Sequence, residues 1–179
     1  SGANSTTDVN ITNSLFTDCV ADGLGAISNV VDGSGAAKHI GFDVRNSRIN
    51  ANELANIRVA NVTPVDELAG HVEHTDLSHS AGTPIYLENA ETSGATHAAL
   101  DFGGGALHSP GHNCIFGGSQ GDVVATRYDL DARRDWWGSP GGPAPGRVAA
   151  AGGTVSSSPA LGSADCGPVH GTVLGPPRP

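Results

Sequence analysis

The tetrapeptide Ile11-Thr12-Asn13-Ser14 returns as Val44-Arg45-Asn46-Ser47, as Val72-Glu73-His74-Thr75 and, less closely, as Phe102-Gly103-Gly104-Gly105. Successive copies are offset by 33, 28 and 30 residues. A nearly constant period in this range is typical of a solenoid, whose units bury their faces against neighbouring units. We therefore expect stacked repeats.

The repeats contain strands and no helical pattern. Apolar and polar residues alternate in short runs, and a second run follows in the latter half of each repeat, over 25–31, 57–62, 85–87 and 114–116. Two or three short strands per repeat indicate a parallel β-helix. An antiparallel sandwich is the alternative, although its hairpins need not repeat in sequence. We expect Asn13 and Asn46 to hydrogen-bond to each other as an amide ladder.

Composition restricts the function. The 179 residues include 26 glycines and only 4% aromatics, which argues against a core of large side chains between long helices. The net charge of -9 argues against a nucleic-acid partner, because phosphate recognition needs a basic surface. No apolar run approaches the roughly 18 residues of a membrane span.

Proline divides the chain. Three prolines precede residue 139 and eight follow it. We predict a β-helix over residues 1–138 and a Pro/Gly/Ala/Ser-rich tail over 139–179, with a final strand near 153–161.

Three cysteines are widely spaced and form no C-x-x-C pair. In an exported protein, a disulfide between Cys114 and Cys166 would tie down the tail. Three free thiols, with Cys19 as the third, are the alternative.

The end of the predicted helix carries a more specific motif. Asn113-Cys114-Ile115-Phe116-Gly117 is followed by the segment 131–143, which contains Asp135-Trp136-Trp137-Gly138, and by a V…S-P-x-L stretch over 153–161. This arrangement resembles the terminal coils of bacterial right-handed parallel β-helix surface proteins of the pectate-lyase-like superfamily, in which Asn usually occupies the place of Asp135. The resemblance implies a right-handed helix, here of about four to five coils. Trp136 and Trp137 would cover its apolar end, or alternatively form a platform for stacking sugars.

The superfamily includes polysaccharide lyases, glycoside hydrolases and passive surface stalks, so the fold cannot name the activity. Asp76 and Asp101 are the candidate catalytic carboxylates, at strand positions in adjacent coils. Solvent-facing structural carboxylates are the alternative.

Histidines gather between residues 71 and 112. On a strand His71 and Glu73 share one face and His74 points to the other, so these three cannot bind one metal. His108, His112 and Cys114 form a candidate metal-binding trio in a loop, against histidines that only bond to backbone. We expect no cofactor.

These observations favour a non-catalytic domain of an exported or cell-surface bacterial protein that serves as a spacer, an adhesin or a carbohydrate-contacting surface. A polysaccharide lyase or glycoside hydrolase is the alternative. Glycans are the expected ligands. The N-terminal coil is expected to be uncapped, which invites another protein chain or further coils.

Overall fold

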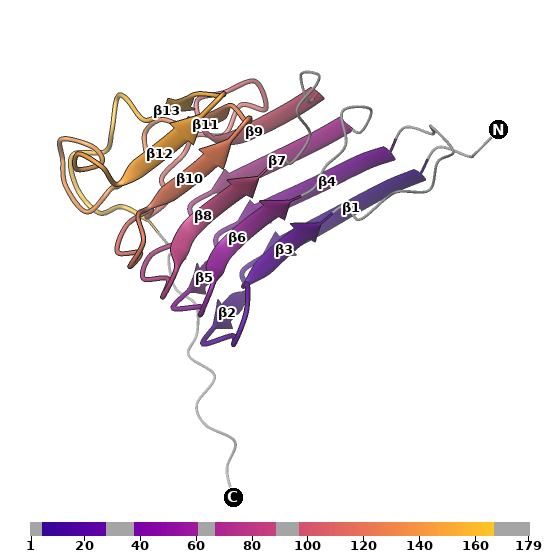
Figure 1. Cartoon of the computed structure of the whole chain (residues 1–179), viewed down its shortest axis with the longest axis horizontal. Coiled ribbons are helices and arrows are strands. Elements are labelled where there is room, and N and C mark those ends of the chain that lie inside the picture. The colour runs from indigo at the N-terminus through magenta and orange to yellow at the C-terminus, as the bar shows by residue number, and fades with distance from the viewer. Residues whose placement is uncertain (1–4, 28–37, 61–66, 89–96, 167–179) are drawn as a thin grey trace, which may run out of the picture.

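The computed structural model describes residues 5–27, 38–60, 67–88 and 97–166 of the chain. These residues form an all-β structure without a helix (Figure 1). Within the described ranges no helix is long and apolar enough to cross a membrane.

Thirteen strands make up the described part of the chain. Three sheets contain them. The six-stranded sheet has the order β1 (Ser5–Thr12), β4 (Lys38–Arg45), β7 (Glu67–Glu73), β9 (His97–Gly103), β11 (Leu130–Ala132) and β13 (Val155–Ser156). The five-stranded sheet has the order β12 (Val148–Ala151), β10 (Val123–Thr126), β8 (Thr83–Glu88), β6 (Ala55–Ala60) and β3 (Leu24–Ile27). β2 (Leu15–Thr17) and β5 (Arg48–Asn50) form a short third sheet.

The strand pairs follow the sequence repeat. Ile11 pairs with Val44, and Val44 pairs with Val72. The printed strand pairs are parallel, which excludes the antiparallel sandwich. The chain is therefore a parallel β-solenoid of at least three turns. The second runs predicted over 25–31 and 57–62 begin as β3 and β6, and their ends lie outside the described residues.

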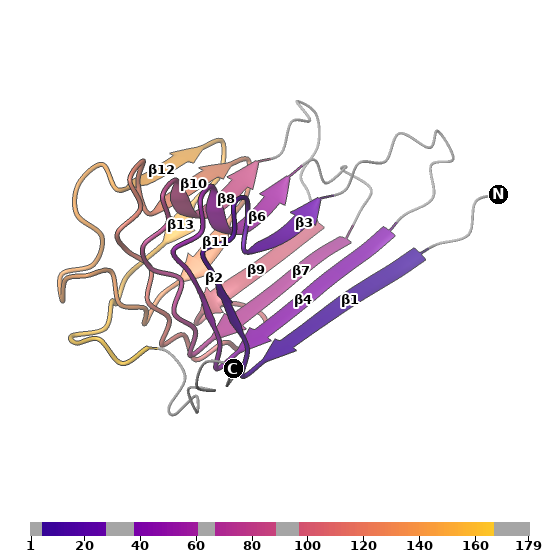
Figure 2. The same cartoon turned by 90° about the horizontal axis from the view of Figure 1, so that it is seen from below.

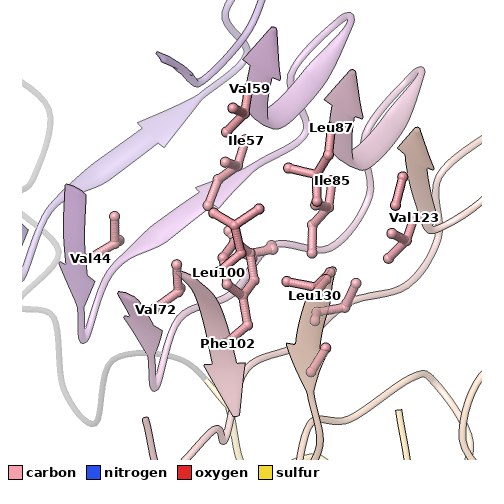
Figure 3. Packing of buried hydrophobic residues seen from close by; sticks show 14 of the residues in the cluster. Val44, Ile57, Val59, Val72, Ile85, Leu87, Leu100, Phe102, Val123 and Leu130 are labelled. Carbon is pink, nitrogen blue, oxygen red and sulfur yellow. The ribbon is translucent and has the colours of Figure 1, made fainter. Parts of the chain in front are cut away.

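The core lies between the two large sheets, which face each other in Figure 2. Alternate residues of each strand point inward, because side chains alternate across a strand. Val44, Val72 and Phe102 meet Ile57 and Ile85 in this interior (Figure 3). Small aliphatic residues therefore fill the narrow space, as the low aromatic content requires.

A sharp corner follows the six-stranded sheet. Its first position has positive φ angles of 47° to 65° in Asn13, Asn46, His74, His112 and Arg134. Asn adopts this left-handed conformation more readily than most residues. The repeated asparagines are thus explained by backbone conformation, and no hydrogen bond joins the side chains of Asn13 and Asn46.

A hydrogen-bonded ladder does exist, one residue later. The members of this corner ladder are Ser14, Ser47, Thr75, Asn113 and Asp135. Each of the first four donates its backbone N–H to the side-chain oxygen of the next, over 2.9 to 3.4 Å. The amide ladder predicted at Asn13 and Asn46 is therefore replaced by a ladder of mixed side chains.

The fourth copy of the repeat departs from the expected corner. Residues 104–111 are inserted after β9, so His112 and Asn113 occupy the corner in place of Gly104 and Gly105. The offsets along the ladder are consequently 33, 28, 38 and 22 residues.

The sheets continue beyond residue 138. β12 extends the five-stranded sheet and β13 extends the six-stranded sheet. A disulfide joins Cys114 to Cys166, with the Cα atoms 5.3 Å apart. The proline-rich segment as far as residue 166 is therefore partly built into the solenoid.

Candidate functional site

The outer face of the six-stranded sheet carries a row of charged side chains on β4 and β7. Phe42 and Val44 point into the core, so Asp43 and Arg45 point outward. Asp43 pairs in register with His71, and Arg45 pairs with Glu73. Strand alternation and parallel register thus bring two acids, one arginine and one histidine together.

Arg45 links the two acids. Its Nε and Nη2 atoms donate to both carboxylate oxygens of Asp43 at 2.7 and 2.8 Å, and its Nη1 donates to Glu73 Oε1 at 3.0 Å. Bidentate pairs of this kind are geometrically specific. Partial burial opposes ionisation of Asp43, but hydrogen bonds from Arg45 and His71 outweigh it and lower the pKa of this carboxyl.

His71 completes the group between the two acids. Its Nδ1 lies 3.0 Å from Asp43 Oδ1, and its Nε2 lies 3.5 Å from Glu73 Oε2. The residue is only 8% exposed. The shared face predicted for His71 and Glu73 is confirmed, and the two carboxylates fix the orientation of the imidazole.

These side chains line a groove of about 470 Å³. β1 contributes Asp8 and Asn10 to its wall. His39 Nε2 lies 3.3 Å from Asp8 Oδ1, and Leu107 of the inserted loop supplies an apolar edge. β1, β4 and β7 lie side by side along this face in both overall views (Figures 1 and 2). The groove therefore offers hydrogen-bonding groups of both charges beside an apolar contact.

Asp101 holds the loop that forms this edge. Its oxygens accept the backbone N–H groups of Gly105 at 2.9 Å and Ser109 at 3.1 Å, and the residue is 1% exposed. Asp101 thus shapes the groove without presenting its carboxylate to solvent.

Asp76 is not beside Asp101. Asp101 is in register with His71 and Asp131, whereas Asp76 bridges Arg48 and Cys114 at the corner. The Asp76 carboxylate accepts hydrogen bonds from four groups, namely Arg48 Nε, Asn50 Nδ2, Ser78 N and Ser78 Oγ. The structure does not bring these two sequence-predicted carboxylates together.

The candidate metal trio is dispersed in a similar way. The Cys114 sulfur is bonded to Cys166. The His112 ring stacks on His74 with centroids 5.0 Å apart, and His108 lies exposed in the inserted loop. Among the described residues, no group of three His, Cys, Asp or Glu side chains is placed to hold a metal ion.

The two tryptophans have different surroundings. Trp137 is 3% exposed and continues an inward column with Ile49, Leu77 and Ile115. Trp136 lies half-buried next to Cys114 on the outer side of the corner. Because β12 and β13 lie beyond them, these side chains are within the stack, and the Trp137 ring has no face free for a sugar.

A second, smaller hollow lies on the outer side of the five-stranded sheet. It has a volume of about 230 Å³ and includes Asp22, Arg58 and Tyr86. The Arg58 guanidinium lies 5.5 Å from the centre of the Tyr86 ring. The larger groove gathers more paired charged groups and is the stronger candidate.

The sequence singled out His71 and Glu73 but missed Asp43 and Arg45 as their partners. The repeat itself held the signal, because copies offset by 28 residues place 43 beside 71 and 45 beside 73. Comparison with protein families, with curated proteins and with solved structures finds no match for this chain.

Proposed function

We propose that this chain is a non-catalytic domain of an exported or cell-surface protein and that the groove on β1, β4 and β7 contacts carbohydrate. The observation that carries the proposal is the group formed by Asp43, Arg45, His71 and Glu73 in this groove. Sugars are recognised through hydroxyl groups, which both donate to carboxylates and accept from guanidinium groups.

Export is supported by the disulfide between Cys114 and Cys166, since disulfides persist mainly in oxidising compartments. The non-catalytic assignment is supported by the state of the carboxylates. Asp76 and Asp101 are saturated with hydrogen bonds, and Asp43 and Glu73 share the charge of Arg45.

We further infer right-handed winding, four to five coils and kinship with the pectate-lyase-like superfamily. Parallel strands joined by a crossover are almost always right-handed. The six strands of the largest sheet support the coil number, and the motif around Trp136 and Trp137 supports the kinship. A crystal structure tests handedness and coil number.

A glycan array with the full chain tests carbohydrate contact. An Arg45→Gln variant should lose at least most of the binding, because it removes the cation that orders both acids. Arg48→Gln is the matched control, since Arg48 pairs with Asp76 away from the groove. If no glycan binds, the spacer version of the proposal remains. If both variants bind equally, the groove is not the site.

An enzyme acting on polysaccharide is the second candidate, favoured by one observation. His71 lies between two carboxylates at a groove wall, which is a suitable setting for proton transfer. Release of reducing ends or unsaturated products, abolished by His71→Gln and retained in Arg48→Gln, would establish activity. Absence of products from a broad polysaccharide panel would reject it.

A further inference from the structure

The N-terminal end of the solenoid presents three strand edges together. β1, β3 and β2 are each the terminal strand of their sheet. They lie at the same end of the molecule in Figures 1 and 2. We call Ser5–Thr12, Leu15–Thr17 and Leu24–Ile27, with the connecting residue Val20, the N-terminal rim. Within the described residues no strand pairs with its outer side.

The rim has none of the usual protection of an edge. Natural proteins discourage strand addition with lysines, prolines or other charges on edge strands. The three strands of the rim contain a single charged residue, Asp8, and no proline. An open edge of this kind favours pairing with another strand.

Apolar exposure is concentrated in the same place. Four large hydrophobic side chains are exposed among the described residues, and three of them are in the rim. They are Val9 at 40%, Leu15 at 64% and Val20 at 86%. In the next repeat Phe42, the partner of Val9, is 5% exposed. The strand that covers a residue thus decides its burial.

The corner ladder also ends at the rim. Ser47, Thr75, Asn113 and Asp135 each accept a backbone N–H from the preceding member with a side-chain oxygen. Ser14 is the first described member, and its Oγ donates to Thr12 O at 3.0 Å. The Oγ lone pairs are suited to accept a backbone N–H from one more strand.

We propose that the N-terminal rim docks a second copy of this chain through the same rim, about a two-fold axis. The partner must supply strand edges, apolar side chains and little charge, and the rim itself meets these conditions. Contact elsewhere would oppose two chains of net charge -9, whereas the rim brings together one acid from each. A two-fold contact between identical surfaces closes at the dimer. This inference is independent of the proposed carbohydrate contact.

Sedimentation velocity of the full chain tests the proposal over micromolar to hundred-micromolar concentrations. A Cys19→Ser background excludes dimers linked through Cys19, the free cysteine of the described residues. We expect a monomer–dimer equilibrium. Leu15→Lys should weaken it at least tenfold, because each dimer then holds two like charges at the interface. Leu54→Lys, which changes a 52% exposed leucine outside the rim, should leave it unchanged.

Hydrogen exchange tests strand pairing itself. Amides of β1 should exchange more slowly at high than at low concentration, and those of β10 should not change. A monomer at every concentration, species that grow beyond the dimer, or a dimer that Leu15→Lys leaves intact would each overturn the proposal. Circular dichroism of both lysine variants checks that they remain folded.

Discussion

At the scale of single residues, Asp135 differs from the other members of the corner ladder because it is an acid. It is fully buried, and its Oδ1 accepts from Asn113 N at 2.9 Å and Asn113 Nδ2 at 3.1 Å. Oδ2 is buried without a hydrogen-bond partner. Burial, aided by the charge of Asp101, raises the pKa of Asp135 well above its usual value, although the bonds from Asn113 act in the opposite direction.

This raised pKa predicts a pH dependence of stability. The folded chain holds the Asp135 proton more tightly than the unfolded chain, so stability is greatest below the unfolded pKa near 3.8 and falls as the pH rises above it. Asp135→Asn keeps the oxygen that Asn113 needs and cannot ionise. We expect it to raise the free energy of unfolding at pH 7 to 8 by about 1–3 kcal/mol.

Urea unfolding of both proteins from pH 4 to pH 8 measures this effect. The difference between Asp135→Asn and the parent chain should widen as the pH rises. A difference that stays constant over this range would contradict the assignment of the proton to Asp135.

The corner conformation gives a second prediction at this scale. Asn46 has a φ of 47°, which a β-branched residue adopts with difficulty. Asn46→Val should therefore destabilise the fold by about 1–2 kcal/mol, whereas Asn46→Gly should cost less. Thermal unfolding of the two variants compares them. Equal losses would show that the Asn46 side chain matters more than its backbone angle.

At the scale of elements, β4 and β7 fit each other by alternating large and small residues. Phe42 pairs in register with Gly70 and lies edge-to-face with Phe102, the ring centres being 6.5 Å apart. A Cβ atom on Gly70 would lie 2.7 Å from Phe42 Cε1 and 2.8 Å from Leu100 Cδ2. Glycine is required here because the Phe42 ring occupies the space over the neighbouring strand.

Gly70→Ala should consequently destabilise the chain by about 1–3 kcal/mol through overpacking. Phe42→Leu removes part of the ring that causes the clash. The double variant should lose less stability than the sum of the two single variants, as contacting residues are not additive. Denaturant unfolding of the three proteins completes the cycle. Additive losses would argue against direct contact.

The inserted loop explains what the sequence predicted poorly at this scale. Residues 104–111 lengthen one repeat, so tetrapeptide matching placed the fourth corner at Gly104 and Gly105. The actual corner residues, His112 and Asn113, lie past the loop. The repeat predicted parallel strands over most of the chain, but an insertion changes the register without changing the strand pattern before it.

At the scale of the whole molecule, the disulfide ties the tail to the corner of the solenoid. Cys114 and Cys166 are 52 residues apart in sequence, and β10 to β13 lie between them. Closing a segment of this length restricts the unfolded chain.

Replacing Cys114 and Cys166 by serine should lower the free energy of unfolding by about 2–4 kcal/mol. Guanidinium unfolding of the double variant measures the loss, with Cys19→Ser as the control expected to match the parent chain. An unchanged midpoint in the double variant would show that the tail contributes to stability without the bond.

The sequence by itself determined the parallel β-solenoid, because period and alternation are local properties of the chain. It also placed His71 and Glu73 on one face of a strand. Only the tertiary structure decided that Asp43 and Arg45 join them and that Asp76 and Asp101 are apart. The same holds for Trp137, which is part of the core. These relations depend on register between strands some 28 residues apart, which one insertion or one shifted corner can change.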